Sequence, residues 1–173
     1  LVPEVMNTYL DLLANYKIRF IHGYPSAISI LAIHAMRRNW IPPSTLIGIL
    51  PVSEQLLSYQ RDLIKKAFRD VRVMPFYGLS EKVAIAGELA DEAGVYEFEP
   101  LYGLTELVDD HGINVVRIGG RGRIVSTGFL SKGMPLLRYD TGDTAELLTL
   151  PDQSNCYRLR VRGIQSRWGQ ELV

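Results

Sequence analysis

The apolar positions in the first half of the chain alternate between helical and extended spacing. Three stretches carry apolar side chains every three or four residues, which is typical of amphipathic helices. The runs between them are short and mostly aliphatic, like strands buried in a parallel sheet. Alternating strands and helices indicate βαβ units with parallel strands. The predicted helices span residues 3–16, 25–38 and 58–69, and the predicted strands span residues 18–22, 46–52 and 71–77.

Beyond residue 86 the spacing changes, because apolar and polar residues alternate and turn residues become frequent. This period of two predicts short, mostly antiparallel strands in a small barrel-like arrangement. The predicted fold class is therefore α/β, with a parallel lobe at 1–86, a β-rich lobe at 87–165 and the start of a linker at 166–173. A ligand is expected where the parallel strands end. The strands predicted in the second lobe span residues 94–99, 102–108, 114–118, 123–127 and 143–148.

Composition narrows the possible functions. The chain has 19 basic and 19 acidic residues, and this neutral balance gives no support to a nucleic-acid partner, which needs a basic face. Cys156 is the single cysteine, so an internal disulfide or a thiolate metal site is excluded, which suits the cytoplasm. No apolar run approaches the roughly 20 residues that span a bilayer, so no membrane partner is expected. The chain begins inside a predicted helix and reads as an internal piece of a longer protein.

Two short polar segments carry the candidate chemistry. Residues 77–81 read Tyr-Gly-Leu-Ser-Glu and end a predicted strand. Tyr77 can stack on a base there, and Glu81 can hold Mg²⁺ beside a phosphate. Residues 138–143 read Arg-Tyr-Asp-Thr-Gly-Asp. Gly142 lets the backbone bend, so that Asp143 can direct both oxygens at a vicinal diol such as a ribose.

These segments resemble the nucleotide-binding signatures of the adenylate-forming (AMP-binding) superfamily. The resemblance is to the branch that contains the phenylacetate-CoA ligases, the coenzyme F390 synthetases and the ligase-like proteins of capsular polysaccharide loci. It runs along nearly the whole chain, because further pieces match in the family's order. These pieces are Tyr24-Pro25-Ser26, Ser53-Glu54-Gln55-Leu56, Gly133-Met134-Pro135-Leu136-Leu137-Arg138-Tyr139 and Ser166-Arg167-Trp168-Gly169-Gln170.

The resemblance implies roles for the matching positions. The small-molecule partners would be a carboxylic acid and a nucleotide, with ATP or AMP, Mg²⁺ and coenzyme A as cofactors. The nucleotide would contact Tyr77, Gly78, Ser80, Asp143, Arg138, Ser53 and Glu54; Glu81 would bind Mg²⁺ and serve catalysis; Tyr24 and Pro25 would line the acyl pocket; and Arg167 would mark the hinge.

The implied reaction uses ATP to convert a carboxylic acid to an acyl-AMP, whose acyl group then passes to coenzyme A. The resemblance predicts an upstream phosphate loop, a central adenosine pocket and a downstream lysine-bearing lid. This chain matches only the centre, as part of the large N-terminal domain, and is expected to be inactive without the missing segments. Some relatives carry a zinc site after the nucleotide turn, but residues 87–98 contain no Cys or His, so no zinc is expected.

Two alternatives to this function stay open. The enzyme could be an adenylyltransferase acting on a hydroxyl, as in the F390 synthetases. The chain could also be a ligase-like scaffold that has kept the fold and lost the chemistry. In the presumed linker, Gly169 and Gln170 stand where the family commonly has an acidic hinge residue.

Several positions also have simpler structural interpretations. Residues 100–106 repeat the pattern of residues 75–81 but lie within a predicted strand, so the first copy is favoured as the nucleotide turn. Residues 138–143 could close a β-hairpin. Ser53 could cap the helix that follows it, and His22 could be structural. A last group, Arg158, Arg160 and Arg162, alternates along a strand and predicts a solvated face.

Overall fold

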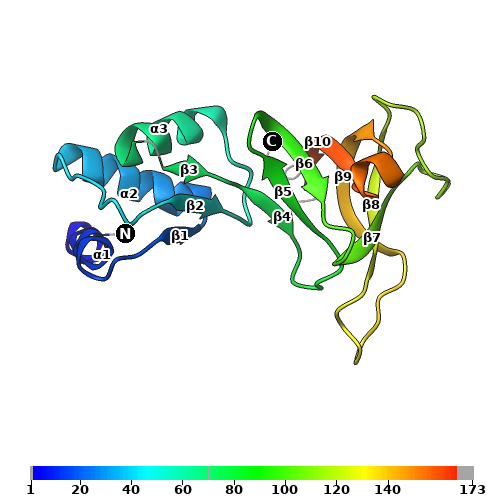
Figure 1. Cartoon of the computed structure of the whole chain (residues 1–173), viewed down its shortest axis with the longest axis horizontal. Helices are drawn as coiled ribbons and strands as arrows, with labels where there is room; N and C mark the ends of the chain where they lie inside the picture. The colour runs from blue at the N-terminus through cyan, green and yellow to red at the C-terminus, as the bar shows by residue number, and fades with distance from the viewer. Residues whose placement is uncertain (1, 70, 167–173) are drawn as a thin grey trace. The chain divides into compact units, whose positions relative to one another are not determined.

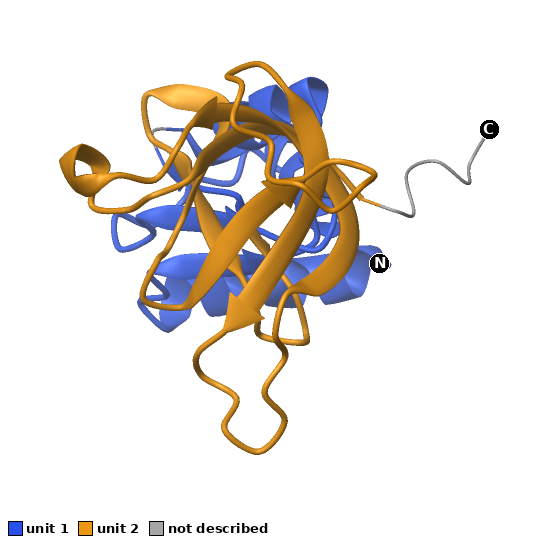
Figure 2. Ribbon diagram, turned by 90° about the vertical axis from the view of Figure 1, so that its right-hand side faces the viewer, with its two compact units in different colours: residues 1–76 blue, residues 77–173 orange. Residues whose placement is uncertain are grey.

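The computed structural model describes residues 2–69 and 71–166. The chain divides into two compact units, residues 1–76 and 77–173, which Figure 2 shows in different colours. The division lies between Phe76 and Tyr77, ten residues before the boundary expected at residue 86. The whole Tyr77 turn therefore belongs to the β-rich unit and not to the parallel unit.

The first unit is a three-stranded parallel sheet with three helices (Figure 1). Its strands pair in the order β1-β2-β3, and both described pairs are parallel, which confirms the βαβ prediction. Pro25 occupies the first turn of α2, where its fixed φ and missing N–H carry no cost. The elements are α1 (Pro3–Asn15), β1 (Phe20–Gly23), α2 (Pro25–Arg37), β2 (Gly48–Pro51), α3 (Ser58–Phe68) and β3 (Arg72–Val73).

One face of this sheet forms the core of the unit. Ile21, Ile49 and Val73 are neighbours across the three strands and share that face. The helices bury their apolar stripes against it, as their spacing predicted. The buried helical residues of this core are Met6, Leu10, Leu13, Ile28, Leu31, Ala32, Ala35, Ile64, Ala67 and Phe68.

The single strand predicted at residues 71–77 is wrong. The structure has two short strands there, β3 and β4 (Phe76–Gly78), and they belong to different sheets. The backbone N–H of Met74 still donates to Ile49 O (2.8 Å), but Pro75 has no N–H with which to continue a ladder. The proline therefore ends the parallel sheet immediately before the second unit begins.

The second unit is a seven-stranded sheet in the order β4-β5-β6-β10-β9-β8-β7. The described pairs are antiparallel, which confirms the predicted mixed α/β fold class. Its buried cluster includes Val83, Phe98, Ile124 and Leu147. The remaining elements are β5 (Ile85–Leu89), β6 (Glu92–Phe98), β7 (Gly103–Val108), β8 (Arg121–Gly128), β9 (Tyr139–Thr149), the 3₁₀ turn η1 (Gln153–Asn155) and β10 (Arg160–Gln165).

A pair of glycines lets this sheet curl. Gly103 and Gly128 are partners on β7 and β8, and the backbone of Val83 lies against both of them. A Cβ on Gly103 would be 2.3 Å from Val83 O, and one on Gly128 would be 3.0 Å from Val83 Cα. The connection between β4 and β5, at one edge of the sheet, thus contacts β7 and β8 at the other. This contact produces the barrel-like form that the sequence predicted.

The strand predicted at residues 114–118 is wrong. Asn114 makes only an isolated bridge to Val108, and Val115 N donates to Leu107 O (2.8 Å). The carboxylate of Asp109 accepts hydrogen bonds from the backbone N–H groups of His111 and Ile113 (2.9 Å each), which favours a turn immediately before this segment.

No helix among the described residues has the length and apolarity to cross a membrane.

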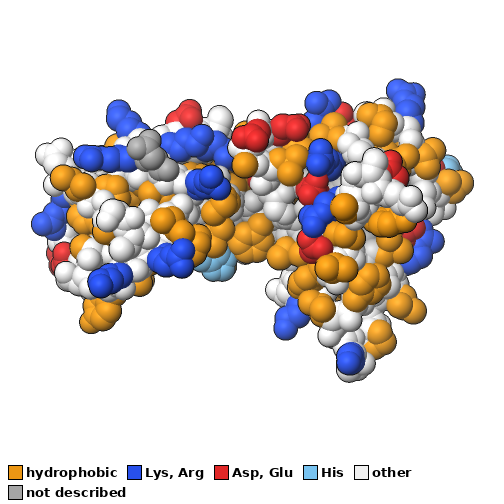
Figure 3. All heavy atoms as spheres, viewed as in Figure 1, with side chains coloured by type: hydrophobic (Ala, Val, Ile, Leu, Met, Phe, Trp, Pro, Cys, Tyr) orange, Lys and Arg blue, Asp and Glu red, His pale blue; other side chains and the backbone are white. Residues whose placement is uncertain are grey.

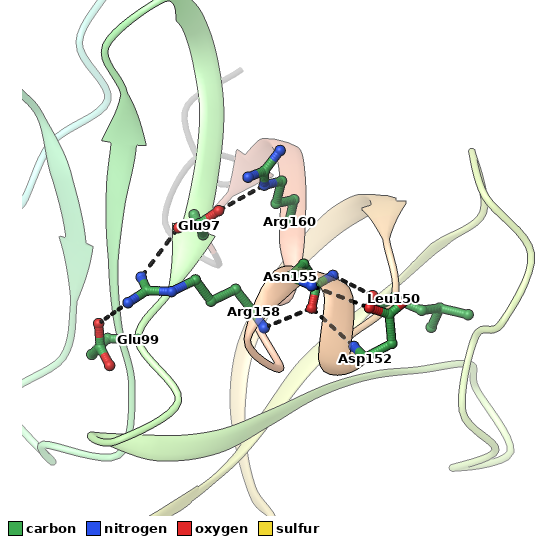
Figure 4. Close-up of polar contacts among 7 residues, drawn as sticks. All are labelled: Glu97, Glu99, Leu150, Asp152, Asn155, Arg158 and Arg160. Carbon is green, nitrogen blue, oxygen red and sulfur yellow. Dashed lines mark hydrogen bonds and ion pairs between the residues drawn. The ribbon is translucent and has the colours of Figure 1, made fainter.

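The alternating arginines lie on a solvated face, as predicted, and they are paired. Arg158 and Arg160 both bind Glu97 (3.1 and 2.7 Å), and Arg158 also binds Glu99 (3.1 Å; Figure 4). The connection that leads to Arg158 is ordered by Asn155, whose amide bonds Leu150 O (2.7 Å). Figure 3 shows acidic and basic side chains interleaved on the second unit. Each of these two arginines thus has an acidic partner on the same face.

The glycine contact gives a first prediction. Gly103→Ala should lower the free energy of unfolding by about 1 to 3 kcal/mol, because the new Cβ meets a backbone oxygen that cannot rotate away. Gly87→Ala is the matched control in the same sheet, since nothing lies within 4 Å of its Cβ position. The control should be neutral or slightly stabilising. Urea unfolding followed by circular dichroism measures both, and equal losses would contradict the proposed close contact.

Candidate functional site

The second polar segment, residues 138–143, begins with the last residue of the hairpin connection, Arg138, and continues in strand β9, where residues 141–143 form a bulge. Arg123 pairs with Thr144 and Val125 with Asp140, so one residue of β8 faces three residues of β9. Gly142 sits at φ +76°, a conformation that favours glycine. The hairpin connection between β8 and β9 is instead residues 129–138. The interpretation of this segment as a simple hairpin turn is therefore wrong.

Side-chain hydrogen bonds of Thr141 and Asp140 hold the bulge. Thr141 Oγ1 donates to Ile124 O (2.9 Å) and accepts from Asp143 N (3.1 Å). Asp140 Oδ1 accepts from Gly142 N (3.0 Å). Thr141 and Asp143 are almost fully buried, with 1% and 5% of their surface exposed. The extra residues of the bulge thus turn the Asp143 carboxylate into the unit.

The first polar segment, residues 77–81, reaches the same place. Tyr77 lies at the end of the sheet in β4, and Glu81 lies in the turn that follows, where Lys82 N donates to Leu79 O (3.0 Å). The contact of Val83 with the paired glycines fixes the chain just after this turn. Tyr77 also packs edge-on against Phe98, with ring centroids 5.8 Å apart.

The two segments are joined crosswise by two hydrogen bonds from tyrosines to carboxylates. Tyr77 Oη donates to Asp143 Oδ2 (2.7 Å), and Tyr139 Oη donates to Glu81 Oε1 (2.8 Å). In each segment the tyrosine stands four residues before the carboxylate. Each segment therefore contributes a donor to the other segment's acid. We call these four residues the tyrosine–carboxylate clasp.

The electrostatics of the clasp keep the phenol of Tyr77 neutral. Burial raises the pKa of Tyr77 well above its ordinary range, and its hydrogen bond to Asp143 raises it further. The hydroxyl therefore stays protonated and donates. A hydrogen bond to a charged group typically contributes about 1.5 to 3 kcal/mol, more than a bond between neutral groups.

The side chain of Arg138, a predicted nucleotide contact, has partners on β7 and in the loop after it. Its Nε donates to Glu106 Oε2 (3.2 Å), and its Nη2 approaches Gly112 O (3.5 Å). Its backbone N–H donates to Thr127 Oγ1 (2.9 Å). Among the described residues, the contacts of this guanidinium are thus on β7 and the loop after it.

A second group of predicted residues lies together in the first unit. The Glu54 carboxylate accepts from Ser26 N (3.1 Å) and Ser26 Oγ (3.0 Å) at the first turn of α2, which Tyr24 caps. An acid at a helix N-terminus is favoured by the helix dipole. Pro25 is buried beneath this turn. The carboxylate of Glu54 thus stabilises the turn that carries the predicted acyl-pocket residues.

The structure bears on two predictions for single residues in this unit, Ser53 and His22. Helix α3 begins at Ser58 with Leu57 as its N-cap residue, so the prediction that Ser53 caps it is wrong. Ser53 instead has φ +67° in the preceding loop. His22 stacks on Phe76 (5.7 Å between centroids, 18° between planes), which agrees with a structural role.

Two residues of the site had no role in the predictions from sequence, and one predicted residue lies outside the described part of the chain. Tyr139 and Thr141 had no assigned role, although the spacing shared by the pairs 77/81 and 139/143 is visible in the sequence. The predicted hinge residue Arg167 lies outside the described residues. Gly103 lies in the second copy of the repeat, in strand β7, and its lack of a side chain leaves room for the backbone of Val83.

No group of three His, Cys, Asp or Glu residues in the described ranges could hold a metal ion by itself.

Comparison with known proteins identifies the fold. No protein-family model matches the chain. An open form of 2-hydroxyisobutyryl-CoA ligase in complex with 2-HIB-AMP and CoA has a TM-score of 0.74 at 22% identity and covers 96% of this chain. The anthranilate CoA ligase AuaEII in complex with anthranoyl-AMP has a TM-score of 0.61 at 18% identity and covers 93% of this chain. The chain has the fold of part of an acyl-CoA ligase.

One similarity is detectable in sequence. Protein CapK of Staphylococcus aureus is 31% identical over 144 residues, which are 83% of this chain. The chain spans 30% of the length of CapK, 40% of the 2-hydroxyisobutyryl-CoA ligase chain and 33% of the AuaEII chain. The matched proteins are thus much longer than this chain.

The buried tyrosine predicts a pH dependence. Tyr77 ionises in the unfolded chain near pH 10 but only at higher pH in the folded chain, so the stability from its protonated hydroxyl is lost as pH rises above about 10. Tyr77→Phe should therefore lose less stability than the wild type between about pH 9 and 11. Urea unfolding across this range measures the effect. Tyr16→Phe is the control, because Tyr16 is 70% exposed, and an identical decline in all three proteins would contradict the assignment.

Proposed function

We propose that this chain belongs to the adenylate-forming superfamily and carries the adenosine-binding part of an ATP-dependent acid–CoA ligase. The observation that carries the proposal is the clasp, which joins the two segments that resemble the superfamily's nucleotide signatures. The shared fold with two acyl-CoA ligases supports it, and so does the similarity to CapK. A fold alone would not suffice, because folds host unrelated functions.

In this proposal three residues of the clasp, Tyr77, Asp143 and Glu81, contact the ligands directly. The ring of Tyr77 stacks on adenine, with Gly78 and Ser80 beside it, and the Asp143 carboxylate accepts hydrogen bonds from the ribose hydroxyls. Glu81 is half-buried in a turn and would supply one hard oxygen ligand to Mg²⁺ held beside the phosphates. A site with one carboxylate suits Mg²⁺, which rarely uses an all-protein cage.

The reaction proposed for the full protein has two steps. A substrate carboxylate oxygen attacks the α-phosphorus of ATP, and pyrophosphate leaves with the electrons of the broken P–O bond. The thiolate of coenzyme A then attacks the acyl carbon, and AMP leaves. Bound Mg²⁺ supplies neutralisation of phosphate charge, while residues of this chain hold the adenosine in place.

Ribose binding and adenine stacking are coupled in this site. Asp143 is only 5% exposed, and Tyr77 Oη already donates to it. A ribose diol must therefore either share the Asp143 carboxylate with Tyr77 Oη or replace that bond.

The substrate pocket is proposed on the first unit. Tyr24 and Pro25 line it, with Ser53 and Glu54 nearby on the loop that the Glu54–Ser26 bonds fix. Within the superfamily, we assign the chain to the branch of the phenylacetate-CoA ligases, F390 synthetases and ligase-like capsular proteins from its sequence motifs. Transfer of AMP to a hydroxyl remains the second candidate reaction, because the same adenosine contacts serve both acceptors.

Asp143 provides the direct test of the proposal. Asp143→Asn should weaken binding of AMP in the presence of Mg²⁺ by about tenfold or more, because a charged acceptor for the ribose diol is lost. Asp140→Asn is the matched control, an exposed acid in the same segment that pairs with Arg123. Chemical shifts in a titration of the folded chain with AMP measure the affinity. A folded wild type that shows no saturable shifts, or a D143N protein that binds as the wild type does, would count against an adenosine site.

Two substitutions at Tyr77 separate the ring from the hydroxyl. Tyr77→Ala should weaken AMP binding by about 5-fold to 100-fold, which is the usual effect of losing one stacked aromatic ring. Tyr77→Phe keeps the ring and removes the competitor for Asp143, so its AMP affinity should equal or exceed that of the wild type. Competition with a fluorescent adenine nucleotide measures both. If the phenylalanine variant binds as weakly as the alanine variant, the hydroxyl rather than the ring holds the nucleotide.

A further inference from the structure

We infer that Tyr139 is a positioning residue for Glu81, whose carboxylate it holds in the orientation that receives Mg²⁺. The inference rests on the proposed function, in which Glu81 is the metal ligand. It assigns a role to a residue for which the sequence motifs provided none. The contact that carries it is the 2.8 Å hydrogen bond from Tyr139 Oη to Glu81 Oε1.

The two residues differ in how firmly the backbone holds them. Tyr139 begins strand β9, pairs with the fully buried Ser126 and packs against the core of the second unit. Glu81 stands in a turn outside the strands, and 58 residues separate it from Tyr139 in the chain. A glutamate on a turn can adopt several rotamers. The hydrogen bond from a tyrosine fixed on the sheet selects one of them.

A tyrosine suits this task because its hydroxyl is neutral. A lysine or arginine in its place would neutralise Glu81 and compete with the metal ion. A carboxylate has about four acceptor directions, so it can accept one hydrogen bond and still coordinate a cation. Residues that orient a metal ligand in this way typically change metal affinity by about 10-fold to 100-fold when they are removed.

The reciprocal bond supplies an internal control. Tyr77 stands in its own segment as Tyr139 does in the other, but it donates to Asp143, which is assigned to the ribose. Loss of the two hydroxyls should therefore have different consequences. Removal of the Tyr139 hydroxyl should weaken the effect of the metal on nucleotide binding, whereas removal of the Tyr77 hydroxyl acts on the nucleotide contacts themselves.

The experiment measures the affinity of the chain for α,β-methylene-ATP with Mg²⁺ and with EDTA, by isothermal titration calorimetry. The readout is the ratio of the two affinities. Tyr139→Phe should lower this ratio by about tenfold, while the affinity in EDTA stays within about twofold of the wild type. Glu81→Gln should lower the ratio at least as far, and Tyr16→Phe, a change of an exposed tyrosine outside the site, should keep it. A ratio that survives in Y139F and falls in E81Q would overturn the inference.

A second measurement decides the case in which the wild type binds no nucleotide. That result would overturn the proposed function for this chain, but the orientation of Glu81 can be tested without any ligand. Urea unfolding of the wild type, Y139F, E81Q and the double variant forms a double-mutant cycle. The two single changes should be non-additive, by about fivefold in the folding equilibrium constant. Additive effects would overturn the inference whether or not nucleotide binds.

Discussion

The site depends on the close approach of one backbone segment to two glycines. Val83 lies against the paired Gly103 and Gly128, at distances that any side chain at position 103 would prevent. This contact brings the connection after β4 onto β7 and β8, so the sheet curls and its two edges meet. Because Glu81 is two residues before Val83, the same contact fixes the start of the turn that carries the proposed metal ligand. Without it, the turn after β4 would stay at one edge of an open sheet, while the other polar segment lies on β9 in the interior of that sheet.

The clasp offsets a destabilising feature of this arrangement. The curled sheet places two carboxylates near each other and buries one of them, and a buried charge without partners is strongly destabilising. A cationic partner would stabilise Asp143 and Glu81 but would also cancel the charge that a metal ion and a ribose require. Tyrosine hydroxyls satisfy the carboxylate oxygens and leave the negative charge in place. The resulting site is negative and hydrogen-bonded, and both properties are needed for the proposed function.

The sequence predicted the local elements well and the long-range contacts poorly. The helical spacing located α1, α2 and α3, and the mixed fold class followed from the change in spacing near residue 86. Residues 71–77 misled, because a single proline divides an apolar run between two sheets. The bond from Tyr139 to Glu81 could not be read from spacing, since 58 residues separate the partners and no periodic pattern encodes such a pairing. The resemblance identified both carboxylates and Tyr77 but assigned no role to Tyr139.

The two units divide the proposed chemistry between them. Tyr77, Asp143 and Glu81, which are assigned to adenine, ribose and metal, lie in the β-rich unit. The parallel unit contains Tyr24 and Pro25, assigned to the acid substrate, and also Ser53 and Glu54, which the resemblance assigns to the nucleotide. The clasp is internal to the second unit, and the Glu54–Ser26 bonds are internal to the first. In the proposed function, substitutions around Tyr24 and Pro25 would therefore leave the two hydrogen bonds of the clasp in place, because the Glu54–Ser26 bonds and the clasp are separate sets of contacts.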